Sequence, residues 1–368
     1  MEYKIPTLPL KGDIETKSVL KKAALAHRAL AELNGVADTI PNESIILNTL
    51  SLQEAQGSSA IENIITTQDD LFSSDSIARH FTSSAAKEVY NYAGALKWGY
   101  AEVKKKGLLT ANQIIDIQAT LEETRSEFRK LPGTALKNAQ TGETVYTPPQ
   151  SHIEIVEYMS NLEQFMNDSE GCDWDPLVKM AIIHHQFESI HPFYDGNGRT
   201  GRIINILYLV KENLLKLPIL YLSRYINQHK ADYYMLLQET RATGNWEPWL
   251  LFILEAIEKT SLQTSAMVRG IKELMMVFKQ KIRNELPKVY SQDLINNLFK
   301  HPYTKIDFLV SDLQVTRQTA SKYLDQLVGI GLLKRVIIGK EHFFVNEKLF
   351  DLLYNVNEMY PFKEEDNK

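Results

Sequence analysis

The sequence predicts a mainly α-helical protein that carries one β-hairpin and ends in a small module of helices and strands. Three observations lead to this fold class. Most segments between Lys17 and Ile282 repeat apolar residues at helical spacing, with capping and turn signals between them. Two short β-prone runs flank a turn between Gly133 and Pro149. From Tyr303 onward, two helical patterns precede two apolar runs that a glycine separates.

The composition is typical of a protein with two or three domains and no membrane segment. The chain has 368 residues and a formal net charge of −5, which gives no bulk attraction to nucleic acid. No apolar signal-peptide core follows Met1, and no apolar run is long enough to span a bilayer. Cys172 is the only cysteine, which excludes an internal disulfide. We therefore expect a cytoplasmic protein with no membrane partner.

The first region, residues 1–85, is expected to be helical. In it, Ser58 and Glu62 are four residues apart within the sequence GSSAIEN, so both side chains would project from one helical face. Ser58, which small residues follow, also suits the start of a helix. Taken alone, the pattern indicates no more than an exposed glutamate on a helix.

The next region, residues 86–265, contains the expected hairpin. Residues 135–138 and 144–147 would be its strands and residues 140–143 its turn, and two prolines then end the second strand. An exposed strand edge can bind an extended peptide through main-chain hydrogen bonds, although ordinary surface hairpins are also common.

A helix is expected at residues 177–190, because an Asp-Pro pair directly before it supplies an N-cap and a first helical residue. This helix would deliver His191 at its end. His184 and His185 lie on it, and together with His191 they raise the alternative of a metal hydrolase. Their spacing lacks a metal-binding pattern such as HExxH, so we interpret them as packed or hydrogen-bonded residues.

Residues 191–202, with the sequence HPFYDGNGRTGR, combine several chemically active groups. An apolar run at helical spacing follows, so this stretch lies where a loop enters a helix, and the first amides of a helix can bind phosphate. Gly196 and Gly198 let successive amides curl into an anion site. Asp195 beside that site would repel phosphate unless a cation intervenes, which implies Mg²⁺. His191 is suited to proton transfer near neutral pH.

Two arginines complete this set. Arg199 and Arg202 lie three residues apart, on one face of the expected helix, and add charge-assisted donors that suit a polyphosphate. The set predicts binding of a nucleoside polyphosphate with Mg²⁺, and phosphoryl or nucleotidyl transfer. An ordinary glycine turn with a structural histidine is the alternative. Downstream, the aromatic pair Tyr233-Tyr234 could stack on a base, or could belong to the core.

Residues 191–202 resemble the signature of the Fic family, HPFx(D/E)GNGRxxR, and match it at every position. The resemblance implies a Fic-type helical bundle that transfers AMP from ATP to a Ser, Thr or Tyr hydroxyl of a target protein, or of the protein itself, with release of pyrophosphate. It implies that His191 is the catalytic base and that Asp195 is the Mg²⁺ ligand. It also implies these ATP-binding residues: Glu62, His191, Gly196, Asn197, Gly198, Arg199, Thr200, Gly201, Arg202, Gln228 and Tyr234.

Residues 57–63 resemble the inhibitory helix of the same family, (S/T)xxxE(G/N), in sequence and in N-terminal placement. The resemblance implies that Ser58 and Glu62 form an inhibitory motif in which Glu62 pairs with Arg202. An arginine held by a bidentate carboxylate cannot also bind a γ-phosphate. ATP would then be held in an unproductive pose, so we expect an autoinhibited enzyme. The resemblance further implies that the hairpin clamps the target and that the protein forms a homodimer.

Residues 266–284 are expected to form a linker helix, and residues 285–368 a separate domain that resembles a winged helix-turn-helix. The expected parts of this domain are a helix at 303–313, a turn with Thr316 as N-cap, a helix at 317–327, and strands at 332–338 and 342–345. Fold alone does not settle function, so the pattern leaves its role open.

The partner of this winged module is open between DNA and protein. Residues 314–345 carry a formal charge of +3, which is a modest footprint for DNA, and the acidic tail at residues 364–366 cancels it. Arg317 and Lys322 would face outward from the second helix, where base-reading residues usually sit. Winged helices also serve as protein-docking modules, so neither partner is excluded.

Three other functions stay open at the level of the sequence. The same site could transfer another nucleotide, or it could remove AMP from a modified protein, with Glu62 orienting a water. The chain could also be a nucleotide-responsive transcription regulator, although a sensor needs no base such as His191. The sequence identifies neither the target protein nor the signal that would release the inhibition.

Overall fold

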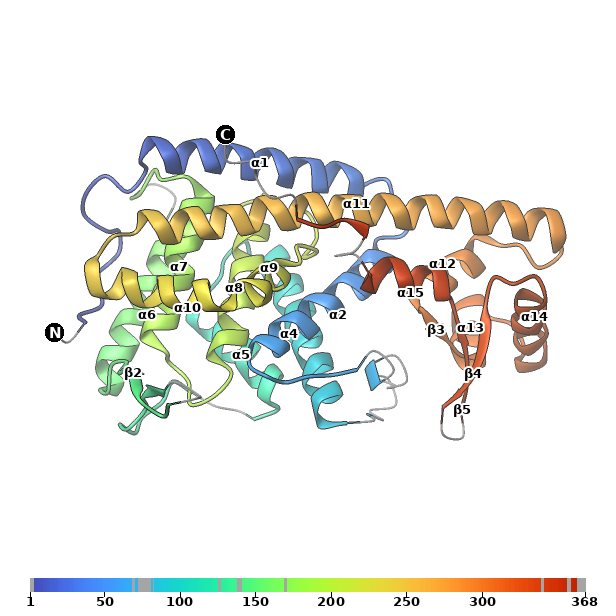
Figure 1. Ribbon diagram of the computed structural model, residues 1–368. Coiled ribbons are helices and arrows are strands. Elements are labelled where there is room, and N and C mark those ends of the chain that lie inside the picture. The colour runs from blue at the N-terminus through green and yellow to red at the C-terminus, as the bar shows by residue number, and fades with distance from the viewer. Residues whose placement is uncertain are drawn as a thin grey trace. The chain divides into compact units, whose positions relative to one another are not determined.

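The fold is that of a computed structural model, which describes residues 3–67, 70–71, 81, 83–124, 127–137, 141–168, 171–338, 341–355 and 359–362 (Figure 1). The chain divides into two compact units. The first unit comprises residues 1–31, 53–65 and 88–261, and the second comprises residues 32–52, 66–87 and 262–368.

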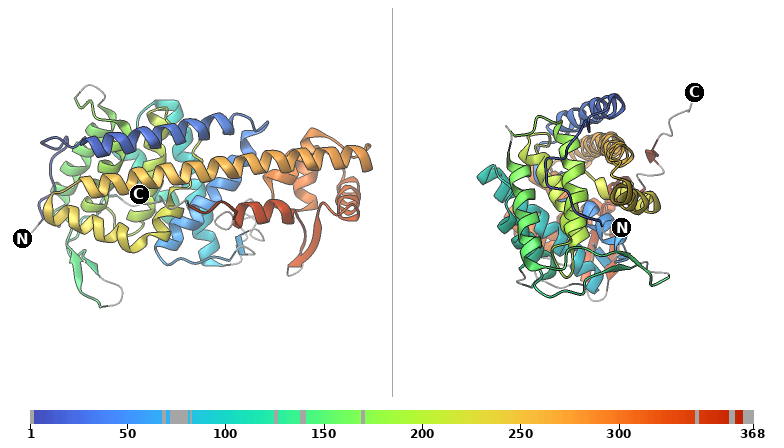
Figure 2. Two further views of the ribbon diagram at one scale, coloured as in Figure 1. Left: turned by 45° about the horizontal axis from the view of Figure 1, so that its top comes forward. Right: turned by 90° about the vertical axis from the view of Figure 1, so that its left-hand side faces the viewer.

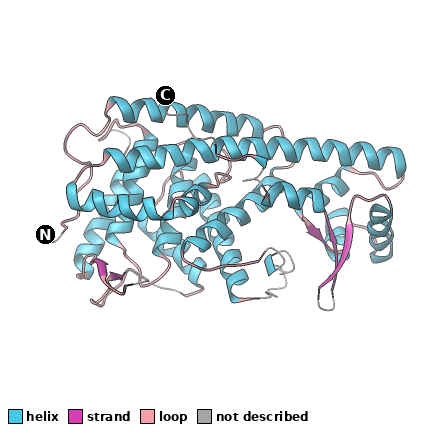
Figure 3. Cartoon of the chain, viewed as in Figure 1, coloured by secondary structure: helices cyan, strands magenta, loops and turns pink. Residues whose placement is uncertain are grey.

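Helices make up most of both units, which confirms the mainly α-helical fold class (Figure 3). The elements wholly within the first unit are α5 (Ala111–Glu122), β1 (Leu136–Lys137), β2 (Thr144–Tyr146), α6 (His152–Asn167), α7 (Pro176–Ile190), α8 (Asn197–Lys211), α9 (Leu222–Gln228) and α10 (Lys230–Thr243). The helices that contribute residues to both units are α1 (Lys17–Ala37), α2 (Glu43–Ile61), α4 (Ser84–Lys106) and α11 (Glu247–Glu285). The elements wholly within the second unit are α12 (Gln292–Lys300), β3 (Tyr303–Thr304), α13 (Ile306–Leu313), α14 (Arg317–Gly329), β4 (Lys334–Ile338), β5 (Glu341–Val345) and α15 (Glu347–Tyr354). Over the described ranges, no helix is both long and apolar enough to cross a bilayer.

Two buried helices, α7 and α8, form the centre of the first unit. Every side chain of residues 177–190 is buried, and so is every side chain of residues 199–210. Helices that are buried on all sides are typical of a bundle interior. Asp175 caps α7 by accepting the Leu177 N–H at 2.8 Å, as the sequence predicts. Because α7 and α8 pack against each other, the loop between them is held at both ends.

The expected hairpin is present in the first unit. Strands β1 and β2 are antiparallel, with Leu136 opposite Tyr146, and they project from the helices of this unit (Figure 2). The Tyr146 hydroxyl is buried and donates to the Ser189 carbonyl oxygen at 2.8 Å. This bond ties the base of the hairpin to the last turn of α7. Residues 138–140, at the expected turn, lie outside the described residues.

Helix α11 differs from the sequence interpretation. The pattern predicts one helix starting near Trp246 and a separate linker helix at residues 266–284, but the structure joins them into one helix of 39 residues. No proline interrupts the run after its first turn. Gly270 inside it permits close packing, because a Cβ there would lie 2.8 Å from Leu352 Cδ1 of α15. The expected domain boundary at 265/266 therefore falls inside a continuous helix.

The C-terminal part of the second unit contains a three-stranded antiparallel sheet in the order β3-β5-β4. Residues 303–304, which the pattern assigns to the start of a helix, instead form β3, because both side chains are buried and pair with β5. Thr316 caps α14 as predicted, since its Oγ1 accepts the Thr319 N–H at 3.2 Å. Strands β4 and β5 are the two expected strands, while residues 339–340 and the acidic tail lie outside the described residues.

Candidate active site

His191 lies at the end of α7 in a left-handed backbone conformation, with φ 49° and ψ 59°. Its N–H donates to the Phe187 carbonyl at 2.9 Å, which completes the last turn of the helix. Its own carbonyl accepts from Arg129 Nε at 2.9 Å, and the Arg129 N–H donates to the Pro192 carbonyl at 2.8 Å. A non-glycine residue at positive φ needs such support, so these bonds fix the position of the His191 ring.

Arg129 is a site residue that the sequence analysis missed. Its side chain is 1% exposed, and besides His191 it contacts the Pro149 carbonyl at the end of the hairpin. The residue therefore joins the hairpin to the loop that carries the histidine. No local pattern marks this arginine in the sequence, because its partners lie 20 and 62 residues away.

The environment of His191 keeps its imidazole neutral. Burial together with the positive charges of Arg129 and Arg241 lowers the pKa of His191 to about 4. Within the described part of the chain, its Nδ1 atom is buried without a hydrogen-bond partner. A neutral imidazole at physiological pH can accept a proton at once, which is what a general base must do.

The N-terminus of α8 begins at Gly196, which is its N-cap and has a φ of 75°. The Asn197 side chain closes the preceding loop by accepting the Phe193 N–H at 2.9 Å and donating to the Phe193 carbonyl at 2.8 Å. No side chain caps the helix, so its first N–H groups keep their capacity to bind an anion.

The two glycines of the loop leave space for acidic side chains. A Cβ on Gly196 would lie 2.5 Å from Glu122 Oε1, and a Cβ on Gly198 would lie 2.4 Å from Glu62 Oε1. These close approaches show that two carboxylates lie against the expected anion site. The sequence analysis identified Glu62 but missed Glu122, which comes from the last turn of α5.

Asp195 lies immediately before this anion site, and its side chain is 81% exposed. One of its oxygens accepts the Gly196 N–H at 2.7 Å. A single exposed carboxylate next to backbone amides suits Mg²⁺, which usually keeps several waters and binds protein through one or two carboxylates together with substrate phosphates. The residues present therefore fit the expected Mg²⁺.

Arg199 does not point freely at the anion site, because its guanidinium lies within ion-pair distance of three carboxylates, those of Glu88, Glu122 and, at 3.9 Å, Asp195. Its Nη1 donates to Glu88 Oε2 at 2.8 Å, and its Nη2 donates to Glu122 Oε1 at 2.9 Å. The arginine side chain is only 5% exposed. Burial raises the pKa of Glu122 even though Arg199 acts in the opposite direction.

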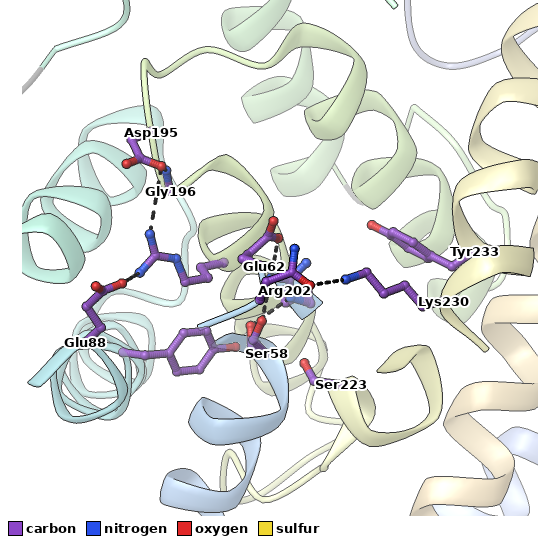
Figure 4. Close-up of polar contacts among 12 residues, drawn as sticks. Ser58, Glu62, Glu88, Asp195, Gly196, Arg202, Ser223, Lys230 and Tyr233 are labelled. Carbon is purple, nitrogen blue, oxygen red and sulfur yellow. Dashed lines mark hydrogen bonds and ion pairs between the residues drawn. The ribbon is translucent and has the colours of Figure 1, made fainter. Parts of the chain in front are cut away.

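Arg202 is fully enclosed and is bound by both residues of the expected inhibitory motif (Figure 4). Its Nε donates to Ser58 Oγ at 2.7 Å, and its Nη2 donates to the Ser58 carbonyl at 3.0 Å and to Glu62 Oε1 at 2.8 Å. The expectation of a bidentate carboxylate is thus wrong in detail. Glu62 supplies one oxygen, and Ser58 supplies the other two acceptors because it lies deeper in the same helix.

Ser58 lies near the end of α2, so the expectation that it starts a helix is wrong. The helix ends at Ile61 in a Schellman motif: the Ile64 N–H donates to the Ser59 carbonyl and the Asn63 N–H to the Ala60 carbonyl, each at 3.0 Å. Asn63 takes the left-handed position with φ 63°, which asparagine tolerates better than most residues. Glu62 therefore sits in the terminal turn.

Charge and contacts hold this terminal turn in place. Although burial alone would raise the pKa of Glu62, the adjacent Arg202 guanidinium outweighs it and lowers that pKa, so Glu62 is ionised. Lys230 Nζ donates to Asn63 Oδ1 at 3.1 Å (Figure 4). Lys230 is the first residue of α10, so this helix contacts the end of α2.

Tyr234 of α10 and Gln228 of α9 lie on exposed surface of the first unit. Tyr234 is 42% exposed and its ring stands edge-on to the buried Tyr233, with 5.1 Å between ring centroids. Burial and the nearby Glu62 carboxylate raise the pKa of Tyr234, which places it close to the terminal turn of α2. Among the described residues, Gln228 makes no hydrogen bond or ion pair that connects it with this cluster.

His184 and His185 are packed and hydrogen-bonded, as the sequence analysis predicts. His184 Nε2 lies 2.9 Å from the Tyr233 hydroxyl, and His185 Nε2 lies 3.2 Å from the Leu237 carbonyl. Burial lowers the pKa of His184 to about 3. Among the residues that the structure describes, no cluster of three or more His, Cys, Asp and Glu side chains could hold a metal ion.

Three family profiles match successive parts of the chain. They are the Fic/DOC family N-terminal profile over residues 20–101, the Fic/DOC family profile over residues 108–209, and the profile of the C-terminal domain of SoFic-like protein adenylyltransferases over residues 274–349. The first two contain the helices α2 and α8 that meet at Arg202.

Curated relatives are similar at modest identity. A protein adenylyltransferase Fic from Aedes aegypti is 26% identical over 175 residues, which are 47% of this chain and 33% of the relative. A protein adenylyltransferase fic-1 from Caenorhabditis elegans is 27% identical over 112 residues, which are 30% of this chain and 20% of the relative. The match thus spans a third or less of the length of these relatives.

Solved structures share the fold. A Fic family protein from Desulfovibrio desulfuricans superposes with a TM-score of 0.58 at 18% identity, covering 92% of this chain and 97% of that chain. Fic-1 from C. elegans superposes with a TM-score of 0.53 at 18% identity, covering 68% of this chain and 72% of that one. The adjoining profile matches and the intact motif at residues 191–202 show that this chain belongs to the Fic/DOC family.

Proposed function

We propose that the protein is a protein adenylyltransferase that moves AMP from ATP to a hydroxyl side chain of a target protein. The proposal rests on the neutral His191, which lies in the loop that leads to the N-terminus of α8. The N-cap of α8 is a glycine, and no side chain caps its first amides. A base and an anion site in adjoining positions are what nucleotidyl transfer to a hydroxyl requires.

The reaction follows from these groups. His191 takes the proton of the target hydroxyl as its oxygen attacks the α-phosphorus of ATP. The bond from the α-phosphorus to the oxygen that bridges to the β-phosphate breaks, and pyrophosphate leaves. The first amides of α8, at residues 197–199, stabilise the phosphate charge. Mg²⁺ at Asp195 would supply further charge neutralisation.

We also propose that the isolated protein is autoinhibited by residues 58–63, here called the brake segment. Ser58 and Glu62 together accept three hydrogen bonds from Arg202, so this arginine is not free to bind a γ-phosphate. The ionised Glu62 also lies against the amide site, where it repels phosphate. A misplaced triphosphate can lower the transfer rate by orders of magnitude.

The surroundings support roles for two further regions. Tyr234 lies near the brake segment with its ring partly exposed, which suits stacking on the adenine base. In the described part of the chain, β1 and β2 pair only with each other, and Arg129 joins the end of this hairpin to His191, so a target segment could add to the hairpin as a further strand. A cytoplasmic location and a homodimer remain expectations of the sequence and of the family resemblance.

The test uses ATP labelled on the α-phosphate, Mg²⁺, and mass spectrometry of the labelled protein. Glu62→Gly should transfer AMP at least about 100-fold faster than the unaltered protein, because Arg202 becomes available. Adding His191→Ala should abolish transfer while leaving ATP binding intact. Equal labelling with and without His191 would contradict the proposed base, and equal labelling with and without Glu62 would contradict the brake.

The same variants separate transfer from removal of AMP. If Glu62 instead orients a hydrolytic water, Glu62→Gly should stop AMP release from a modified protein. Nucleotide binding without turnover in every variant would favour a nucleotide-responsive regulator. Labelling with another nucleotide only would show that the donor is not ATP.

A further inference from the structure

Helix α2 contains a buried carboxylate that the proposed chemistry does not use. Glu54 is 1% exposed and lies four residues before Ser58 on the same helical face. In the described part of the chain, no lysine or arginine forms an ion pair with it. A carboxylate buried in this way needs hydrogen-bond donors, so the groups that face Glu54 indicate its role.

Two residues supply these donors. The Ser223 N–H donates to Glu54 Oε2 at 3.0 Å, and the Ser223 hydroxyl donates to Glu54 Oε1. The Tyr92 hydroxyl of α4 donates to Glu54 Oε1 at 3.2 Å. Glu54 is therefore the acceptor for three donors from two other helices, α4 and α9.

Glu54 also fixes α2 against the start of α9. Ser223 is the second residue of α9, and the N-cap residue Tyr221 makes no side-chain capping bond. Glu54 supplies that missing acceptor from another helix. One turn further along α2, Gly57 lies so close to Tyr221 that a Cβ would be 2.7 Å from its ring. The two contacts anchor α2 just before the brake segment begins.

Two hydroxyl groups connect this anchor with the arginine. The Tyr92 hydroxyl donates to Glu54 Oε1 at 3.2 Å, and the Ser58 hydroxyl, one turn after Glu54 on the same face of α2, accepts from Arg202 Nε at 2.7 Å. Because Glu54 holds α2 one turn before Ser58, it fixes the position from which Ser58 meets Arg202.

We propose that Glu54 is a positioning residue of the brake: through Tyr92 and Ser223 it anchors the end of α2, so that Ser58 is held where it accepts from Arg202. The proposal rests on the proposed function, in which Arg202 binds phosphate once it is released. Glutamine at this position has one acceptor oxygen instead of two. Its other terminal group is an N–H₂, which cannot accept a hydrogen bond from any of the three donors. At least one bond would be lost, and the end of α2 that carries Ser58 would be held less firmly against Arg202.

The test compares AMP transfer at saturating labelled ATP in matched variants. Glu54→Gln should raise the rate at least about fivefold over the unaltered protein, and Tyr92→Phe should raise it to a smaller extent. In the Glu62→Gly background, Glu54→Gln should change neither kcat nor the KM for ATP by more than about twofold. The control is Glu258→Gln, another buried carboxylate of the first unit, which pairs with Lys22 at 3.0 Å and should leave the rate unchanged.

Amide hydrogen exchange of peptides that cover the brake segment provides a readout that needs no enzymatic activity. Glu54→Gln and Tyr92→Phe should speed this exchange, while Glu258→Gln should not. Exchange unchanged in a folded Glu54→Gln or Tyr92→Phe protein would overturn the proposal. A Glu54→Gln/Glu62→Gly double variant that transfers AMP much more slowly than Glu62→Gly would also overturn the proposal, because Glu54 would then support the site rather than the brake. Absence of transfer in Glu62→Gly would refute only the proposed function.

Discussion

At the scale of single residues, the site depends on how charges are placed around His191 and Arg202. Desolvation and the nearby charges of Arg129 and Arg241 disfavour the charged form of His191. Arg202 is 1% exposed but has the Glu62 carboxylate beside it, so its charged form is retained. One motif thus contains a neutral base and a permanent cation 11 positions apart in sequence.

The pH dependence of transfer tests the environment of His191. A base with a pKa near 4 stays neutral as the pH falls, whereas an unperturbed histidine would lose about three-quarters of its neutral form at pH 6. The Glu62 carboxylate raises the pKa of His191, so the removal of Glu62 should lower that pKa further. We therefore expect single-turnover transfer by Glu62→Gly to change less than about twofold between pH 6 and pH 8. An acid limb with a midpoint near 6.5 would contradict this.

At the scale of elements, the start of α8 is the part of the fold that the site uses most directly. Its N-cap is a glycine at positive φ, and two acidic side chains from α5 and the end of α2 approach within contact distance of its glycines. This segment can bind an anion because its amides have no side-chain cap. Any added side-chain volume there affects both the backbone and the neighbouring carboxylates.

Substitution of Gly196 separates these two effects. Gly196→Ala in the Glu62→Gly background should raise the KM for ATP at least about tenfold, because the new Cβ would lie 2.5 Å from Glu122 Oε1. Gly244→Ala is the matched control, since Gly244 has a φ of 71° at the end of α10 and no atom within 4 Å of the added Cβ. Both variants should lose about 1–2 kcal/mol of stability. An equal KM in both would show that crowding at α8 has no effect.

At the scale of the whole molecule, the distribution of charge decides how the C-terminal module can interact. Four of its described basic residues are paired with carboxylates of the same unit: Arg317 with Asp307, Lys334 with Glu347, Arg335 with Asp325 and Lys305 with Glu341. The formal net charge of the whole chain is −5. Phosphate binding would have to break these pairs before these four cations could replace counterions on DNA.

We therefore expect the full-length protein to bind a random 30-base-pair duplex with a Kd no tighter than about 10 µM at 0.15 M salt, as measured by fluorescence anisotropy. Asp307→Asn together with Glu347→Gln should tighten binding and steepen its salt dependence, because Arg317 and Lys334 lose their partners. Submicromolar binding by the unaltered protein would instead favour a DNA reader.

Much of the local structure could be predicted because it depends on residues within a turn of one another. The Asp175 cap, the end of α7 at His191, the Thr316 cap and the strands of both hairpins follow from such local preferences. Local patterns failed where packing overrides them. Ser58 suits a helix start by type but lies inside α2, where burial and Arg202 hold it.

The sequence by itself determined the family, the helical class and the stretch that holds the base and the anion site, because a contiguous motif brings those groups together along the chain. The family resemblance already implied the pair of Glu62 with Arg202, but only the tertiary structure decided which carboxylates meet Arg199. Glu88 lies 111 residues and Glu122 lies 77 residues from that arginine. Glu54 is joined to Ser223 across 169 residues. Such partners are set by how helices pack, and no local rule relates positions that far apart in sequence.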